Sequence, residues 1–290
     1  MISNTSSGYE WFAAGVPELF SIVIPARNEA KNLQVVVRTL LTKLEGAGVN
    51  HEILVVDDGS TDNTRDILVE LTGRYPTVRF VENSSPHGFG LAVRAGLANF
   101  RGDAVAIVMA DGSDDPADLV KYYSKLNEGY DCVFGSRFMA GSKLIDYPIH
   151  KLVINRFANL FIQALFQIRY NDITNAFKCY RRTVIAGLEP ILAHHFNLTV
   201  ELPLKAIIRG YSFAVIPISW TNRTSGISKL KIREMGSRYL FIVLYCLIER
   251  LLSRGDYRRK PAWHTSLEKL ETVQPRDLPH SVQTIDEIHK

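Results

Sequence analysis

The chain has 290 residues, of which 46% are hydrophobic and 22% charged, and its net charge is +4. This composition is typical of a globular protein with one or two domains and a full core, and so small a net charge gives no reason to expect nucleic acid as a partner. The three cysteines, Cys132, Cys179 and Cys246, have no metal-like spacing. Their odd number favours reduced, buried thiols in a cytosolic protein over disulfides.

The first half of the chain alternates short apolar runs with amphipathic segments. Strands are expected at 20–24, 53–57, 78–81, 104–109 and 131–134. Helices are expected from Asn28 to Leu44, over 88–100, and from Pro116 to Leu126. A further helix, containing Ile67, Leu68 and Leu71, is expected to begin after a cap at Thr61 or Asp62. This alternation indicates βαβ units, so we predict an α/β fold with a mainly parallel sheet. Residues 1–18 lack such a pattern and are expected to form an N-terminal leader.

Two of the predicted strands run into acidic clusters. Asp57 and Asp58 follow the second strand, and a cluster from Asp111 to Asp115 follows the fourth. Ligands of open α/β sheets bind at the carboxyl ends of the strands. Carboxylates there can hold a divalent metal, which in turn can hold a diphosphate. The pairing therefore predicts an enzyme that uses a nucleotide sugar or another nucleotide diphosphate.

Beyond residue 147 the pattern changes to longer amphipathic segments. Residues 148–168 carry an apolar stripe opposite a polar ridge, and residues 230–252 are apolar with basic residues at both ends. Each is expected either to pack as an ordinary helix or to touch lipid at an anionic membrane surface. The longest apolar run, 239–248, is too short to span a membrane. Residues 261–290 are expected to form a flexible tail.

Two motifs carry a resemblance to a known family. Residues 21–29 (SIVIPARNE) resemble the opening strand of family 2 glycosyltransferases, and residues 55–64 (VVDDGSTDNT) are similar to the second motif of that family. The resemblance covers residues 19–235. It implies a glycosyltransferase catalytic domain with the GT-A fold, a Rossmann-like, mainly parallel sheet flanked by helices. It also implies a nucleotide-sugar donor and inversion at the anomeric carbon, and it leaves 236–260 as an amphipathic, membrane-surface helix.

Four further segments resemble the dolichyl-phosphate mannose synthase branch of the family and its bacterial polyprenyl-phosphate relatives. They lie at 135–138, 155–159, 172–181 and 223–230. The implied reaction moves a hexose from GDP-mannose or a UDP-sugar to a polyprenyl phosphate (dolichyl or undecaprenyl). We expect it at the cytoplasmic face of a membrane, with the chain bound peripherally through its amphipathic helices or through a membrane-protein partner.

The motifs and the resemblance together assign roles to individual residues. The donor-binding set is Pro25, Asn28, Glu29, Asp57, Asp58, Gly88, Arg94 and Asp111. The set for the acceptor phosphate is Arg137, Lys151, Asn155 and Arg156. A loop able to close over the donor or acceptor phosphate contains Arg223, Ser228 and Lys229. Asp111 and Arg137 are the expected catalytic residues, and Asp111 is the expected ligand of Mg²⁺ or Mn²⁺.

The chemistry of the acceptor fits this assignment. A lipid monophosphate is largely dianionic at pH 7, so it needs no general base, only cations that hold it in line with the anomeric carbon. The relatives carry Asp-x-Asp where this chain has Met109-Ala110-Asp111. Either Asp111 holds the metal with help from Ser113 or Asp114, or metal dependence is weakened. Glu201 is either an acidic group near the active site or a carboxylate favoured by a helix dipole.

Two other functions stay open at this point. One is transfer to a soluble or polysaccharide acceptor, against which the motifs around Arg137 and 223–229 weigh. The other is a non-catalytic subunit that binds nucleotide sugars, which the missing first carboxylate would favour.

Overall fold

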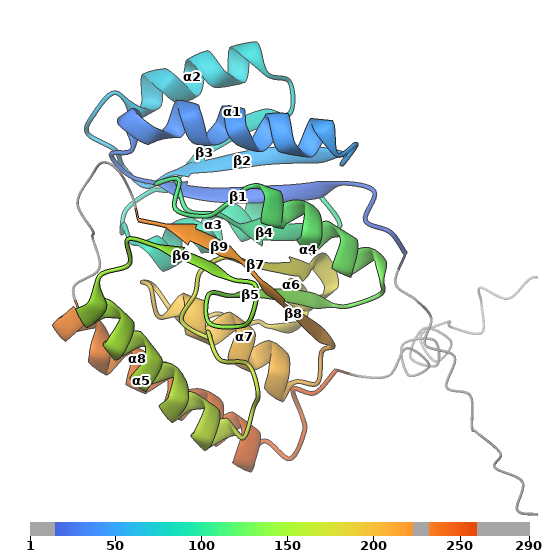
Figure 1. Cartoon of the computed structure of the whole chain (residues 1–290), viewed down its shortest axis with the longest axis vertical. Coiled ribbons are helices and arrows are strands. Elements are labelled where there is room, and N and C mark those ends of the chain that lie inside the picture. Colours follow the sequence, from blue (N-terminus) through green and yellow to red (C-terminus); the bar gives the residue numbers. More distant parts are fainter. Residues whose placement is uncertain (1–14, 223–231, 260–290) are drawn as a thin grey trace, which may run out of the picture.

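The computed structural model describes residues 15–222 and 232–259, which form an α/β sandwich around one large sheet (Figure 1). The seven-stranded sheet has the order β3-β2-β1-β4-β7-β5-β8. Its strands are β1 (Phe20–Ala26), β2 (His51–Asp57), β3 (Val78–Glu82), β4 (Ala104–Ile107), β5 (Cys132–Ser136), β7 (Lys178–Arg181) and β8 (Phe213–Pro217). Only β7 within this sheet runs antiparallel, to both of its neighbours. The predicted mainly parallel α/β fold is confirmed.

Helices cover both faces of the sheet because successive residues of each central strand point to opposite sides. Ile22 and Ile24 of β1 join one core, and Val23 between them joins the other. The helices of the first core are α1 (Ala30–Gly46), α2 (Thr64–Arg74) and α4 (Ala117–Asn127). Those of the second are α3 (Phe89–Asn99), α5 (Ile149–Phe166), α6 (Arg182–Gly187), α7 (Leu198–Ile208) and α8 (Ile232–Leu252).

The observed strands differ from the predicted ones mainly at their ends. β1 continues through Pro25 to Ala26. Proline lacks the N–H that a strand donates to its neighbour, but β4 pairs only with residues 20–23, so no hydrogen bond to β4 is lost at Pro25. β5 extends to Ser136, whereas β4 ends at Ile107. Sequence reasoning missed β7 and β8 as strands. It also missed a separate two-stranded ribbon of β6 (Lys143–Ile145) and β9 (Ser219–Thr221).

The two long amphipathic segments are helical and lie side by side at the lower edge of the molecule (Figure 1). α5 contributes Ile162 and Phe166 to the second core, and α8 packs on α7 with Ile242 and Cys246 buried. Across the described ranges, no helix has both the length and the apolar character needed to cross a membrane. The predicted leader (apart from residues 15–18) and the predicted tail at 261–290 fall outside the described residues.

Candidate active site

The loops after β1 and β2 are fastened to each other at the carboxyl edge of the sheet. Asn28, which has a positive φ of 52°, donates its backbone N–H to Ser60 Oγ at 2.9 Å and accepts from the Thr61 N–H at 2.7 Å. The Glu29 N–H donates to Thr64 Oγ1 at 2.9 Å. The predicted donor residues Asn28 and Glu29 thus shape this edge of the sheet through backbone and side-chain bonds, and Pro25 lies in the buried strand β1 that leads to it.

Asp58 organises the loop that leads from β3 into α3. Its Oδ1 accepts from Asn83 Nδ2 at 2.7 Å and lies 3.3 Å from His87 Nδ1, while its Oδ2 accepts the Gly88 N–H at 2.9 Å. Asp57 accepts the Ser60 N–H at 3.0 Å. Sequence reasoning placed these carboxylates at the carboxyl edge of the sheet, where the structure has them. It missed Asn83 and His87, which lie in a loop without a recognisable motif.

Glycines let this loop come close to its neighbours. Gly59 has a φ of 69°, and a Cβ there would lie 2.5 Å from the His87 ring. Both features disfavour larger residues at this position, because the backbone would be strained and the His87 ring would have to move. Gly88 is the residue just before α3, and Arg94 lies half-buried inside that helix.

The second acidic cluster brings two carboxylates together after β4. Asp111 accepts the Ser113 N–H at 3.1 Å, and Asp114 accepts the Met109 N–H at 3.3 Å. Burial, together with the charge of Asp111, raises the pKa of Asp114 to about 7. Asp115 instead accepts the Ala117 N–H at 2.9 Å and caps the start of α4. In the ranges that the structure describes, three or more His, Cys, Asp or Glu side chains nowhere gather into a ready metal site.

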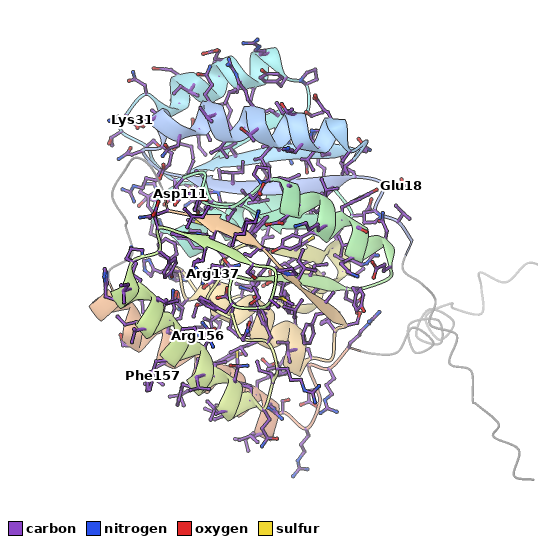
Figure 2. All side chains as sticks on the ribbon, viewed as in Figure 1. Glu18, Lys31, Asp111, Arg137, Arg156 and Phe157 are labelled. Carbon is purple, nitrogen blue, oxygen red and sulfur yellow. The ribbon has the colours of Figure 1, made fainter. Side chains whose placement is uncertain are left out.

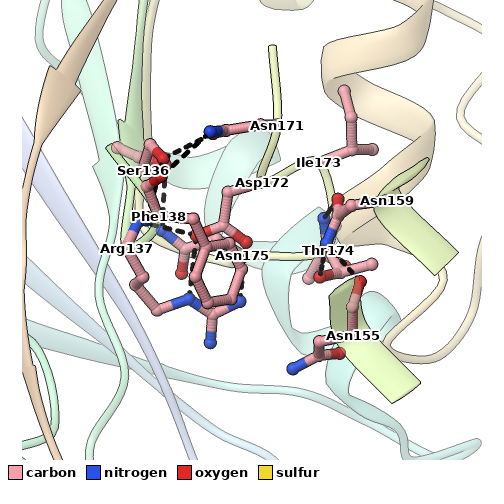
Figure 3. A network of polar contacts seen from close by, with 12 residues as sticks. Ser136, Arg137, Phe138, Asn155, Asn159, Asn171, Asp172, Ile173, Thr174 and Asn175 are labelled. Atoms are coloured by element: carbon pink, nitrogen blue, oxygen red, sulfur yellow. Dashed lines mark hydrogen bonds and ion pairs between the residues drawn. The ribbon is translucent and has the colours of Figure 1, made fainter. Parts of the chain in front are cut away.

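Arg137 lies at the end of β5, and its planar fork is engaged by Asp172 (Figure 3). Nε donates to Asp172 Oδ2 at 2.8 Å and Nη2 donates to Oδ1 at 2.7 Å, and the Asp172 side chain is fully buried. The sequence-based expectation had this fork facing a phosphate. In the structure it faces Asp172, and only Nη1 turns elsewhere, lying 3.5 Å from the Tyr147 hydroxyl.

The predicted acceptor residues of α5 do gather beside Arg137. The guanidinium carbons of Arg137 and Arg156 lie 5.3 and 4.9 Å from the centre of the same Phe138 ring, an arrangement typical of cation–π contacts. Asn155 donates to the Tyr147 hydroxyl, so it meets the same group as Arg137 Nη1. In Figure 2, Asp111, Arg137, Arg156 and Phe157 follow one another from the sheet edge to the outer face of α5.

An apolar groove opens between α5 and α8 next to this cationic cluster. Its volume is about 320 Å³. Its polar lining residues are Tyr147, Lys151, Asn155 and Thr174. Its apolar walls are formed by Ile154, Phe157, Ala158, Phe161, Ile162, Tyr239, Leu240 and Val243. Lys151, the fourth predicted acceptor residue, therefore lines the same groove as Asn155.

Around the groove, both helices carry large apolar side chains that are exposed on the surface. Ile149 is 77% exposed, Phe157 74% and Leu252 73%. Others of this set are Val153, Leu160, Phe161, Leu240, Phe241, Leu244, Ile248 and Leu251. We call these eleven residues the apolar face of α5 and α8. An exposed apolar surface of this kind marks a contact with a membrane, a ligand or another protein.

The remaining predicted residues are placed as follows. Arg223, Ser228 and Lys229 lie outside the described residues. The strand that precedes them, β9, is tied to the acidic cluster by a bond from the Thr221 N–H to Ser113 O at 2.9 Å. Glu201 is fully buried and paired with Lys205 at 2.6 Å, so its carboxylate does not line the site.

Comparison with known proteins places the chain among glycosyltransferases. The model of the family "Glycosyl transferase family 2" matches residues 21–188. The chain is 33% identical over 215 residues to a polyprenol monophosphomannose synthase of Mycolicibacterium smegmatis, covering 72% of this chain and 80% of that protein. It is 32% identical over 218 residues to a dolichol-phosphate mannosyltransferase of Pyrococcus furiosus, covering 73% of this chain but only 59% of that protein.

Solved structures agree on the fold. Glucosyl-3-phosphoglycerate synthase from Mycobacterium tuberculosis in complex with UDP has a TM-score of 0.60 at 19% identity, over 80% of this chain and 79% of that one. The same enzyme with Mn²⁺, UDP and phosphoglyceric acid has a TM-score of 0.59 at 20% identity, over 80% and 78%. These likenesses show the GT-A-like fold. The family match and the two relatives show that the chain is a glycosyltransferase of family 2, similar to enzymes that make polyprenol-phosphate mannose.

Proposed function

We propose that this enzyme transfers a hexose from GDP-mannose or a UDP-sugar to a polyprenyl phosphate, with inversion, at the cytoplasmic face of a membrane. The observation that carries the proposal is the apolar groove of α5 and α8, whose lining residue Tyr147 lies 3.5 Å from Nη1 of Arg137, the arginine that shares the Phe138 ring with Arg156. A lipid monophosphate has the same two parts, a doubly charged head and an apolar chain. The names of the two relatives support the same acceptor class.

The donor is proposed to lie along the loops after β1, β2 and β4. There the Asn28 loop, the Asp57–Asp58 turn and the start of α3 form one connected edge. Asp111 and Asp114 are the carboxylates that would hold a divalent cation here, because both belong to the loop after β4 at this edge. Bound Mg²⁺ or Mn²⁺ would supply charge neutralisation for the departing diphosphate. The Mn²⁺ in the related solved structures is consistent with this role.

The chemical step is an in-line displacement. A phosphate oxygen of the acceptor forms a bond to the anomeric carbon as the bond to the nucleoside diphosphate breaks, and the leaving diphosphate takes the electron pair. The dianionic phosphate carries no proton that must be removed. Arg156, Lys151 and Nη1 of Arg137 can hold it in place by charge. No side chain is required as a general base, which agrees with the burial of Glu201.

The apolar face of α5 and α8 also supports peripheral binding to the membrane. The apolar face of α5 and α8 would enter the boundary between headgroups and acyl chains, and the exposed Arg250 and Arg254 at the end of α8 would meet anionic headgroups. The free, buried cysteines suit a reducing compartment such as the cytoplasm.

The Phe157→Glu variant tests this acceptor assignment. Burying a phenylalanine side chain is worth about 1.5–3 kcal/mol. We therefore expect the KM for polyprenyl phosphate in vesicles to rise roughly 10-fold or more, with the KM for the donor unchanged. The matched control is Val35→Glu, because Val35 is also exposed (66%) but lies on α1. Equal effects of the two substitutions, or none from Phe157→Glu, would contradict the proposed acceptor.

A further inference from the structure

Glu201 holds a loop rather than a substrate. Its Oε1 accepts the Leu192 N–H at 2.8 Å and the Lys205 ammonium at 2.6 Å, and its Oε2 accepts the Ala193 N–H at 2.7 Å. Glu201 and Lys205 are both fully buried. Hydrogen bonds to a buried carboxylate are strong and costly to lose, so Glu201 fixes the position of the backbone at Leu192 and Ala193.

The loop that Glu201 holds presses directly on the start of α3. The Leu91 N–H donates to His194 O at 3.2 Å. A Cβ at Gly88 would lie 2.6 Å from His194 O, and a Cβ at Gly90 would lie 2.6 Å from the His194 carbonyl carbon. Only glycine permits this approach of two backbones at either position. The path of the chain at His194 therefore determines where the first turn of α3 can lie.

The start of α3 also contacts the donor edge. The Gly88 N–H donates to Asp58 Oδ2 at 2.9 Å. The Phe89 ring stacks on Phe196 with a centroid distance of 4.3 Å. A continuous series of contacts thus runs from Glu201 through residues 192–194 to Gly88 and on to Asp58.

From this series we infer that Glu201 is a positioning residue for the nucleoside diphosphate of the donor. It acts through the backbone of residues 192–194, which sets the first turn of α3 against Asp58. The inference rests on the proposed placement of the donor along this edge. It gives a role to a buried acidic residue that takes no part in proton transfer.

The test is the binding of GDP and of UDP, each with Mn²⁺, to the full chain and its variants. Glu201→Gln keeps the shape but cannot accept all three hydrogen bonds, so we expect the dissociation constant of the bound nucleotide to rise about 10-fold. Glu249→Gln is the matched control. It breaks a buried pair with Arg209, at 2.7 Å, in the same part of the core, without touching residues 190–195. For it we expect binding within about twofold of wild type.

A second variant keeps the test possible if Glu201→Gln alone does not fold. Glu201→Gln combined with Lys205→Met removes both charges and leaves no lone ammonium in the core. The N–H groups of Leu192 and Ala193 still lose their carboxylate, so we expect weak nucleotide binding here too.

Hydrogen exchange of the nucleotide-free chain provides a readout that does not depend on the donor or the acceptor. We expect faster exchange at residues 88–92 in the Glu201 variants than in Glu249→Gln. Unchanged exchange and unchanged nucleotide binding in Glu201→Gln would overturn the inference. So would equal changes in Glu249→Gln, or a loss of kcat with nucleotide binding intact. Absence of transfer to polyprenyl phosphate would overturn only the proposed function.

Discussion

Asp111→Asn is expected to lower kcat by at least about 10²–10³-fold, the range seen when one electrostatic contact to the transition state is lost. The amide keeps the size of the side chain and the bond from the Ser113 N–H. What it loses is the negative charge that, with Asp114, would hold the cation against the leaving diphosphate. The measurement is the rate of hexose transfer at saturating donor, with Mg²⁺ or Mn²⁺, alongside a melting curve that shows an intact fold.

Asp115→Asn is the control for this prediction. Asp115 belongs to the same cluster but caps α4, through a bond from the Ala117 N–H at 2.9 Å. Its replacement should leave the transfer rate nearly unchanged and cost at most about 1 kcal/mol of stability. Full activity of Asp111→Asn, or equal losses in the two variants, would remove Asp111 from the metal site. Nucleotide binding without any transfer by the wild-type chain would instead favour a non-catalytic subunit.

Arg137→Ala is expected to raise the KM for the lipid phosphate far more than the KM for the donor. The residue lies on the Phe138 ring with Arg156, and its Nη1 lies 3.5 Å from the hydroxyl of Tyr147, which lines the groove. The substitution also leaves Asp172 buried without its partner, so we expect the free energy of unfolding to fall by about 3–5 kcal/mol. Steady-state kinetics with each substrate varied in turn, and a denaturant titration, measure the two effects.

Arg156→Gln separates the kinetic effect from the loss of stability. Arg156 is exposed, and its replacement leaves no buried charge behind. We expect the same selective rise in acceptor KM, with unfolding within about 0.5 kcal/mol of wild type. Arg169→Gln, an exposed cation just after the far end of α5, should change neither. If Arg137→Ala and Arg156→Gln alter both KM values equally, the cationic cluster belongs to the donor side.

The sequence predicted the parts of the fold that depend on local patterns. Strands β1, β2 and β4 each contain a short apolar run, and α1 has buried leucines and valines at helical spacing, so the existence of these elements follows from local patterns. Strand β7 was missed because it has only four residues, and its placement between β4 and β5 depends on pairing with residues more than 40 positions away in the chain. Such pairings leave no periodic signal.

For the candidate site, the sequence indicates positions along the chain but not contacts. Sequence motifs and helical spacing single out the acidic clusters, Arg137 and the α5 residues, and the structure brings Arg137, Asn155 and Arg156 together. What the sequence could not give was the partner of each charge. Asp172 lay inside a recognised motif, yet nothing local indicated that it would occupy the Arg137 fork.

The most direct test of the whole account is the transfer of labelled sugar into a product that partitions into organic solvent. The purified full chain would be incubated with GDP-mannose and a panel of UDP-sugars, with vesicles carrying undecaprenyl or dolichyl phosphate, and with Mg²⁺, Mn²⁺ or a chelator. The account predicts label in the organic phase from one donor, its loss with the chelator, and none in parallel reactions with 3-phosphoglycerate. Label that appears only in a water-soluble product would contradict the account.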